Sequence, residues 1–497
     1  MCAGQARIWQ LKHLVRGRLV TNRAGVTALA ALAMLNVFTL GAGVAVAKML
    51  PARLALWQIP RVARAGLAEP GSVLVPAGAQ GPAPNRRRLA AALAPLAASH
   101  TLGGHVGLVV TDLDSGSVLY SRQAASGFEP ASSAKLLTAT AALSVLGPSA
   151  RFTTRVVGGA HGSVVLVGGG DPTLAAGRPP KSDYPQPATL ESLAASTAHW
   201  LRAHGERRVR LGYDTSLFTG PQTAPGWSPS YISTGNVTPI ASLEVDQGRL
   251  TPAGTPQDAD DPNNFRPRSY APATGATSAF ASLLRRDGIH VAGQPVTGRQ
   301  PRHAVPVAAV RSPALAEIVG WMLRESNNVI AEDLARQVAL RTGRPVSVGG
   351  AAAAVTAVVG RLGGRHGVHL VDGSGLSPRD RVTPAALAAV VRLAATGRPA
   401  ALRAAVTGMP VAGFSGTLAP GQSVFGGGFG APALGMVRAK TGNLSNVASL
   451  SGITTDASGH VLAFAFMADQ IAKGSQLTSA AGTIDAMATA LARCGCR

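Results

Sequence analysis

The chain has 497 residues, of which 14% are charged and 4% aromatic, and its formal net charge is +22. This length accommodates two or three domains with a sizeable core. The arginines are scattered and aromatic residues are few, which argues against nucleic acid as a partner, because nucleic-acid binding uses basic patches with stacking aromatics. Two explanations of the positive charge stay open: attraction to an anionic surface or polymer, and an arginine-rich composition without functional meaning.

The cysteine and histidine residues give no sign of a metal or cofactor. The cysteines stand at positions 2, 494 and 496, which is neither a disulfide framework nor a zinc-binding spacing. Cys494 and Cys496 can pair in an oxidising compartment, although so short a loop is strained. His366 and His369 lie three residues apart but lack a nearby carboxylate, so surface or core histidines explain them better than a metal site. We therefore expect no metal and no cofactor.

Residues 24–47 carry no charge and are strongly apolar, and about 20 such residues span a bilayer. The basic residues within 1–23 place the N-terminus in the cytoplasm and everything after Lys48 outside. The length favours an uncleaved transmembrane anchor, but Ala-Val-Ala at 45–47 resembles a signal cleavage site, and cleavage there would release the protein. Either way the rest of the chain is exported. Residues 48–86, rich in Gly and Pro from position 66, are expected to form a linker.

Apolar periodicity and turn signals predict a mixture of helices and strands. The expected helices are, in chain order, 87–98, 131–146, 190–204, 277–287, 313–324 with Ser312 as its N-cap, 349–362, 383–396 and 477–493. The expected strands are the hairpins 105–122, 151–174 and 447–468, a strand that ends at Tyr213 and Asp214, and a strand at 435–442. Between 221 and 276 the chain is rich in Pro, Gly, Asn and Asp, and little regular structure is expected there.

A serine and a lysine stand one turn apart at the start of the predicted helix 131–146. The chain has only six lysines among its 46 basic residues, so a lysine at position 135 is unusual. Lysine can lose its proton whereas arginine cannot. The spacing of Ser132 and Lys135 puts both on one face, where the helix N-terminus stabilises charge on oxygen. Taken alone, a capping serine and a solvated lysine explain the pair better than catalysis.

The second candidate segment is Arg-Glu-Ser-Asn-Asn-Val at 324–329, after a predicted helix. Ser326 and Asn328 are two apart, so in a turn or loop both can face one cleft. Ser326 can relay a proton between Lys135 and a departing amine, and Asn328 can hold a substrate amide through its donor and acceptor. A polar helix C-cap is the alternative.

The third candidate segment is Arg-Ala-Lys-Thr-Gly-Asn at 438–443, on a predicted strand. Lys440 and Thr441 offer a charge and a hydroxyl for a carboxylate, and Gly442 leaves room for a peptide against the strand edge. The backbone N–H groups of Asn443 and Ser132 are suited to form an oxyanion hole. As an isolated tripeptide, Lys-Thr-Gly is a weak signal.

In this chain order the three segments match the S-x-x-K, S-D-N and K-T-G signature of serine β-lactamases and penicillin-binding proteins, with Ser-Asn-Asn as the second. Over residues 90–495 the chain resembles the D-alanyl-D-alanine carboxypeptidase/endopeptidase family of low-molecular-mass (class C) penicillin-binding proteins. The segments that carry the resemblance are FEPASSAKLLTA (128–139), GGGDPTL (168–174), SNNVIAEDL (326–334), DGSGLS (372–377), PVAGFSGTL (410–418) and VRAKTGNLSNV (437–447).

The resemblance implies an α+β fold: a serine β-lactamase/transpeptidase-like catalytic domain, with an antiparallel sheet flanked by helices, a helical lobe and an inserted domain. The catalytic domain would comprise 87–155 and 308–497, with the insert at 156–307. Ser132 would be the acylated nucleophile and Lys135 its base. Ser326 with Asn328, and Lys440 with Thr441 and Gly442, would complete the site. Ser374 is better explained as a turn near this site than as a second nucleophile.

The implied function is a serine D-Ala-D-Ala carboxypeptidase or endopeptidase that acts on peptidoglycan stem peptides outside the cytoplasm and is acylated by β-lactam antibiotics. A β-lactamase is the first alternative, but no Glu-x-x-Leu-Asn segment for a deacylating glutamate is found, and the insert is long. A non-catalytic wall-binding protein is the second, and the three intact motifs argue against it. The sequence does not distinguish carboxypeptidase activity from endopeptidase activity.

Overall fold

The computed structural model describes residues 84–159, 162–181, 184–250, 266–363, 367–397, 399–423, 425, 430–472 and 475–495. The predicted tail 1–23, the membrane segment 24–47 and most of the linker 48–86 lie outside the described residues. Within the described part, no single helix is long and apolar enough to cross a bilayer. Pro384–Thr396 and Ala400–Thr407 reach that length only together, as a pair bent by 109°.

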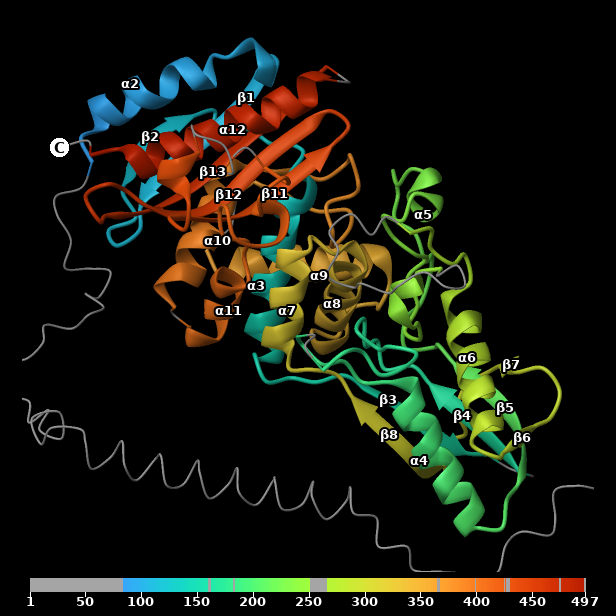
Figure 1. The fold of residues 1–497 in the computed structure, drawn as a ribbon. Coiled ribbons are helices and arrows are strands. Elements are labelled where there is room, and N and C mark those ends of the chain that lie inside the picture. The colour runs from blue at the N-terminus through green and yellow to red at the C-terminus, as the bar shows by residue number, and fades with distance from the viewer. Residues whose placement is uncertain are drawn as a thin grey trace, which may run out of the picture. The chain divides into compact units, whose positions relative to one another are not determined.

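A five-stranded antiparallel sheet combines strands from the two ends of the described chain (Figure 1). Its order is β11-β12-β13-β1-β2. The strands are β1 (His105–Asp112), β2 (Val118–Arg122), β11 (Val437–Leu444), β12 (Val447–Thr455) and β13 (Val461–Asp469). The predicted hairpins 105–122 and 447–468 and the strand near 435–442 are thus confirmed. Because β11 lies at an edge, one row of its backbone groups points away from the sheet.

Helices cover both faces of this sheet because its side chains alternate between two apolar layers. On β13, Phe464 belongs to the core shared with one pair of helices and Ala465 to the core shared with the other. The first pair is α2 (Arg86–Ala97) and α12 (Ser475–Arg493), and the second is α3 (Lys135–Leu146) and α10 (Pro384–Thr396).

The helices α7, α8, α9 and α11 pack with α3 and α10 in the second layer. They span Leu315–Arg324, Asn328–Arg341, Val348–Arg361 and Arg403–Thr407. The sequence analysis missed α8, because the helix is buried on nearly all sides and carries the buried charged residues Glu332, Asp333 and Arg336, which interrupt its apolar pattern. The predicted N-cap of α7 was also wrong. Ser312 instead accepts a hydrogen bond from the backbone N–H of Phe152, and α7 begins at Leu315.

A second sheet is built from residues 153–311 and has the order β6-β5-β4-β3-β8, with β7 paired to β5. Its strands are β3 (Thr153–Gly158), β4 (Ser163–Val167), β5 (Arg208–Asp214), β6 (His290–Val291), β7 (Val296–Thr297) and β8 (Val305–Arg311). The helices α4 (Leu190–Ala203) and α6 (Pro272–Arg286) share its apolar core. The contacts group all described residues in one compact unit, so the domain boundaries stay a prediction.

The described residues between β5 and α6 contain little regular structure, as predicted. A single turn of helix, α5 (Ser230–Ser233), and a short 3₁₀ turn at Asp246–Gly248 interrupt the loop. Val237 and Ile240 of this loop pack against Val329 of α8 and Leu376. The loop therefore lies directly on the helical layer, beside the residues that the sequence motifs single out.

Candidate active site

Ser132 lies in a 3₁₀ turn, Ala131–Ala134, that leads directly into α3 at Lys135. The predicted helix 131–146 therefore starts with a tighter turn. Ala131 has a φ of 46°, a conformation that costs a non-glycine residue free energy and is concentrated at functional sites. Within this turn the Nζ of Lys135 donates a hydrogen bond to the Oγ of Ser132 at 2.8 Å. The expected pairing of the two side chains is thus present in the structure.

Lys135 is fully buried and has two further acceptors. Its Nζ donates to Oδ1 of Asn328 at 2.6 Å and to the carbonyl oxygen of Ser374 at 2.8 Å. Burial lowers the pKa of Lys135 to about 7, against the opposing effect of the negative charges of Asp372 and Glu332. A substantial fraction of the lysine is thus neutral near pH 7 and can accept a proton. An arginine could not do this.

The second motif is placed at the start of α8. Asn328 is the first residue of this helix rather than part of a loop, which corrects the predicted turn or loop. Its Nδ2 donates to the carbonyl oxygen of Asn236 at 2.9 Å, so its Oδ1 is turned toward Lys135. Ser326, with a φ of 55°, lines the same cavity as Ser132. Its hydroxyl makes no hydrogen bond to Lys135 in the described structure, so Asn328 is the direct contact of the lysine.

Asn327, for which the sequence analysis predicted no catalytic role, has a structural role. Its Oδ1 accepts from the backbone N–H of Ile330 at 3.1 Å and so caps α8. Its Nδ2 donates to Oε1 of Gln247 at 2.6 Å. The middle residue of the motif thus joins α8 to the loop between β5 and α6.

The third motif lies on β11, but its residues are not equally accessible. Thr441 and Asn443 line the cavity, whereas Lys440 is fully buried behind them. The Nζ of Lys440 donates to the carbonyl oxygen of Thr441 at 2.8 Å, and the hydroxyls of Thr441 and Thr417 are 2.8 Å apart. Burial, reinforced by Lys135, holds the pKa of Lys440 well below its usual value. A carboxylate in the cavity would therefore meet the threonine hydroxyls first, with the lysine behind.

Gly442 is needed because β11 packs tightly against the nucleophile turn. A Cβ at this position would lie 2.7 Å from the carbonyl oxygen of Pro130 and 3.0 Å from the nitrogen of Ser133. Ser449 on β12 strengthens this joint between β11 and the nucleophile turn. Its hydroxyl is 2.8 Å from that of Ser133 and 2.9 Å from the carbonyl oxygen of Pro130. The sequence analysis explained this glycine by room for a peptide, and that stays a prediction. The structure adds that the glycine lets the strand approach the turn that contains Ser132.

The free edge of β11 presents backbone groups to the cavity. Near its start, the carbonyl of Val437 and the N–H of Ala439 point away from β12, toward Ala412 and Pro410. The register with β12 continues without a bulge from 437 to 444. Backbone groups alternate sides along a strand, so those of Thr441 and Asn443 also point away from β12. Those of Asn443 are suited to an extended peptide and to an oxyanion, whereas the carbonyl of Thr441 already accepts a hydrogen bond from Lys440.

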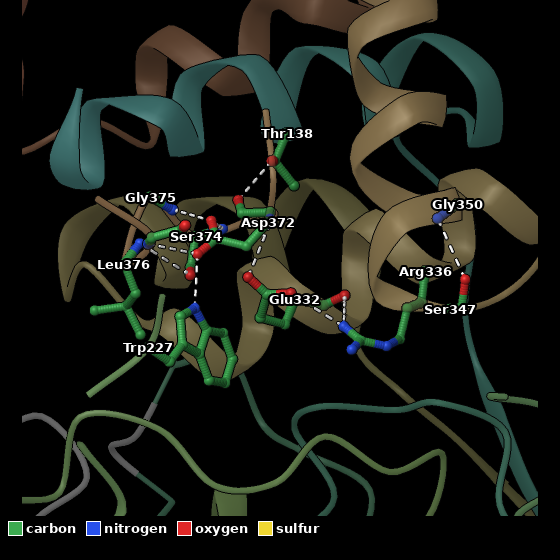
Figure 2. A network of polar contacts seen from close by, with 12 residues as sticks. Thr138, Trp227, Glu332, Arg336, Ser347, Gly350, Asp372, Ser374, Gly375 and Leu376 are labelled. Carbon is green, nitrogen blue, oxygen red and sulfur yellow. Dashed lines mark hydrogen bonds and ion pairs between the residues drawn. The ribbon is translucent and has the colours of Figure 1, made fainter. Parts of the chain in front are cut away.

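Buried carboxylates hold the turn at 372–377 in place by accepting hydrogen bonds from its backbone (Figure 2). Asp372 accepts from the backbone N–H groups of Ser374 and Gly375, at 3.0 and 2.6 Å, and from the indole N–H of Trp227 at 2.7 Å. Glu332 accepts from the N–H of Gly373 at 2.8 Å. These bonds orient the carbonyl of Ser374 toward Lys135, which confirms that Ser374 belongs to a turn near the site.

These elements surround a cavity of about 500 Å³. One side, which we call the motif wall, consists of Ser132, Ser326, Asn328, Thr441 and Asn443. A second side, the insert wall, consists of Gly235, Asn236, Arg249 and Arg268, all from the loop between β5 and α6 and its junction with α6. The sequence analysis identified every member of the motif wall and none of the insert wall. It also missed Thr417, although this residue lies in one of the segments that carry the family resemblance.

Of the remaining sequence candidates, the described residue His369 does not line this cavity. His369 is an exposed residue of the two-residue strand β9, and His366 lies outside the described residues. Among the described residues, no group of three or more His, Cys, Asp or Glu is placed to hold a metal ion. Cys494 is disulfide-bonded, and its partner lies outside the described residues.

Comparison with known proteins agrees with this geometry. The model of the D-Ala-D-Ala carboxypeptidase 3 (S13) family matches residues 89–274 and 259–492. The chain belongs to this family. It is 38% identical over 443 residues to carboxypeptidase DacB of Mycolicibacterium smegmatis, with 88% of this chain and 90% of the relative covered. It is 30% identical over 441 residues to a D-alanyl-D-alanine carboxypeptidase of Actinomadura sp., with 73% and 78% covered.

Solved structures support the fold of this S13 member. Penicillin-binding protein 4 of Haemophilus influenzae superposes with a TM-score of 0.64 at 22% identity, covering 81% of this chain and 98% of that one. The predicted family, the α+β architecture with helix-flanked antiparallel sheet, and the class of serine D-Ala-D-Ala carboxypeptidase hydrolases are thereby confirmed.

Proposed function

We propose that this S13 member cleaves D-Ala-D-Ala termini of peptidoglycan stem peptides through an acyl-enzyme on Ser132. The observation that carries the proposal is the 2.8 Å hydrogen bond between Ser132 and a fully buried Lys135 whose pKa lies at about 7. This arrangement provides a nucleophile and a base that works at neutral pH.

In the proposed acylation, the Oγ of Ser132 bonds to the carbonyl carbon of the penultimate D-Ala while its proton passes to Nζ of Lys135. The oxyanion is held by the N–H groups of Ser132 and Asn443. The C–N bond then breaks, and the leaving D-Ala takes a proton from Lys135, directly or through Ser326. Water attacks the ester in the second half, and Lys135 again accepts the proton that returns to Ser132.

The substrate lies along the free edge of β11, paired with the backbone of Thr441 and Asn443 as an added strand. Its terminal carboxylate contacts the hydroxyls of Thr441 and Thr417. Lys440 stands directly behind Thr441, and a bound carboxylate favours its charged form. Carboxylate binding is therefore coupled to proton uptake by Lys440 in this proposal.

The same machinery can cut a D-Ala cross-link as an endopeptidase, because that reaction also proceeds through a Ser132 acyl-enzyme. β-Lactams are the expected inhibitors, since their strained amide takes the place of the scissile bond. We place the enzyme outside the cytoplasm, anchored in the cell membrane by residues 24–47 or secreted if that segment is cleaved. N-terminal sequencing of the purified protein distinguishes anchor from cleaved signal.

A fluorescent penicillin tests the assignment of the nucleophile. The full-length wild type is expected to form a stable covalent adduct and Ser132→Ala none, while the exposed Ser282→Ala on α6 serves as the matched control. Release of D-Ala from a pentapeptide is then measured with the same three proteins. A label that disappears within seconds would identify a β-lactamase. Equal labelling of Ser132→Ala, or no labelling of the wild type, would reject Ser132 as the nucleophile and favour a binding role.

A further inference from the structure

The insert wall brings two arginines to the cavity that contains Ser132. Arg249 follows the short turn at Asp246–Gly248, and Arg268 follows the segment 251–265, which the structure does not describe. Both line the cavity, and Arg268 is only 5% exposed. Buried arginines are normally paired with carboxylates, since an unpaired buried charge is costly.

These two guanidinium groups are held by neutral oxygen atoms. Arg268 donates from Nε to the carbonyl of Gly235 and from Nη1 to the carbonyl of Gln247, each at 2.9 Å. Arg249 donates from Nη1 to Oε1 of Gln247 at 2.6 Å, and its buried Nε has no partner. Within the described residues, neither arginine has a carboxylate within the 4.0 Å of an ion pair.

The acidic residues nearby do not replace such a partner. Glu325 lines the same cavity, but its ion pair, at 3.1 Å, is with Arg324. Burial raises the pKa of Glu244 well above its usual value, which favours its neutral form. Burial lowers the pKa of Arg249 to about 10 and that of Arg268 to about 9, so both stay charged at neutral pH. Asp246 and Glu325 are close enough to raise the pKa of Arg249, but among the described residues neither guanidinium of the insert wall forms an ion pair within 4.0 Å.

We propose that Arg249 and Arg268 form a subsite for a carboxylate of the peptide substrate, with Arg249 as the residue that contacts it. This inference rests on the proposed function, whose substrates are anionic peptides. A guanidinium group presents planar N–H donors whose geometry matches that of a carboxylate. A bound carboxylate would give the two guanidinium groups the ion-pair partner that no described carboxylate provides.

The position of Arg249 is fixed relative to the catalytic residues. Gln247, which holds its Nη1, is itself held by Asn327 and is almost fully buried. Asp246 and Gln247 have φ angles of 51° and 56°, so the backbone is held in the left-handed region to present these side chains. The chain of contacts runs from the second motif through Gln247 to the guanidinium group. The subsite is thus part of a rigid frame rather than a loose surface charge.

Two carboxylates of a stem peptide have the required chemistry: the C-terminal one of the leaving D-Ala, and a side-chain carboxylate on the residue before the two D-Ala residues. Three probes separate them. N-acetyl-Glu-D-Ala-D-Ala and N-acetyl-Gln-D-Ala-D-Ala differ only by a side-chain carboxylate. Benzylpenicillin carries a single carboxylate in place of the C-terminal one.

The experiment compares wild type with Arg249→Gln, and uses Arg208→Gln as the matched control, because Arg208 is an exposed residue of β5 outside the cavity. The kcat/KM for D-Ala release and the second-order rate of penicillin acylation are measured. For a side-chain carboxylate, we expect wild type to prefer the Glu peptide about 10-fold and Arg249→Gln to lose the preference. For the C-terminal carboxylate, we expect all three probes to react about 10-fold more slowly with Arg249→Gln.

Folded Arg249→Gln with all three rates within twofold of wild type would overturn the subsite. Binding of both peptides to the Ser132→Ala background, with and without Arg249→Gln, separates this result from failure of the proposed function. If wild type releases no D-Ala but an Arg249-dependent affinity for a peptide persists, the catalytic proposal fails and the subsite stands. If Arg249→Gln leaves both affinities unchanged, the subsite is rejected whether or not the enzyme cleaves peptides.

Discussion

The two walls of the cavity are built in different ways. The motif wall is assembled from short local segments: Ser132 shares one turn with its buried partner Lys135, and Thr441 and Asn443 share one strand edge. The insert wall uses residues from a loop with little regular structure, and each is placed by a contact with a distant element. Local geometry thus sets the nucleophile and its base, while tertiary contacts set what surrounds them.

The loop that carries the insert wall nevertheless contacts residues on two sides of Lys135. The carbonyl of Asn236 holds the amide of Asn328, Gln247 holds Asn327, and Trp227 holds Asp372. The first contact orients the Oδ1 that meets Lys135, and the third supports the turn whose carbonyl meets it. The loop therefore acts on the lysine from two directions without touching it.

The largest effect is expected from Lys135→Arg, which tests the motif wall alone. The substitution keeps a positive charge but replaces the group that accepts the proton of Ser132 in the proposed mechanism. Penicillin acylation should fall about 1000-fold, in line with the loss of a general base. Stopped-flow or gel-based labelling gives the rate, and thermal unfolding shows whether the protein is folded. A folded variant that reacts within 10-fold of wild type would exclude proton transfer to Lys135 as the role of this residue.

Composition explains why the residues of the motif wall could be predicted from the sequence and those of the insert wall could not. Lysine is rare in this chain, with six among 46 basic residues, so Lys135 and Lys440 could be singled out and joined to motifs. Arg249 and Arg268 stand among the many arginines, and nothing in their neighbourhood distinguishes them from surface residues. Only the structure shows that they face the cavity and that no described carboxylate forms an ion pair with them.

The apolar periodicity failed to predict α8 for a related reason. The apolar periodicity predicted α4, α9, α10 and α12 nearly to their observed ends, because each exposes some polar residues and buries apolar ones. In α8 the buried face includes Glu332 and Arg336, which pair with each other at 3.1 Å. Such a pair can be recognised only once the surrounding elements are known. The burial of Lys440 behind Thr441 could not be predicted either, since two adjacent residues in the sequence do not show which of them reaches the cavity.

An intermediate effect is expected from Gly442→Ala, which tests the joint inside the motif wall. The added methyl group would press on the carbonyl of Pro130 and separate β11 from the nucleophile turn. We expect a loss of about 1–3 kcal/mol in the free energy of unfolding. Acylation should slow by about 100-fold because Ser132 moves relative to Asn443. Gly275→Ala on α6, where a Cβ has open space, is the control. Unchanged stability and acylation in Gly442→Ala would show that this joint tolerates movement.

The smallest effect is expected from Trp227→Phe, which tests the support that the loop gives to Lys135. Phenylalanine keeps an aromatic ring but lacks the N–H that reaches Asp372 at 2.7 Å. The turn at 372–377 should become less ordered, so the Ser374 carbonyl is held less well against Lys135. We expect kcat for D-Ala release to fall about 10-fold with KM little changed. Trp200→Phe on α4, where the indole ring stacks on His204, is the matched control.

The pH profile separates this positioning role from a purely electrostatic one. Lys135 accepts a proton only in its neutral form, so acylation of wild type should rise with pH and reach half its maximum near the lysine pKa of about 7. Asp372→Asn removes a negative charge that raises this pKa, and its midpoint should move to lower pH. Trp227→Phe leaves that charge in place, so its rate should fall at every pH with the midpoint unchanged. A shifted midpoint in Trp227→Phe would show that the loop acts on Lys135 through its charge environment rather than through the position of the Ser374 carbonyl.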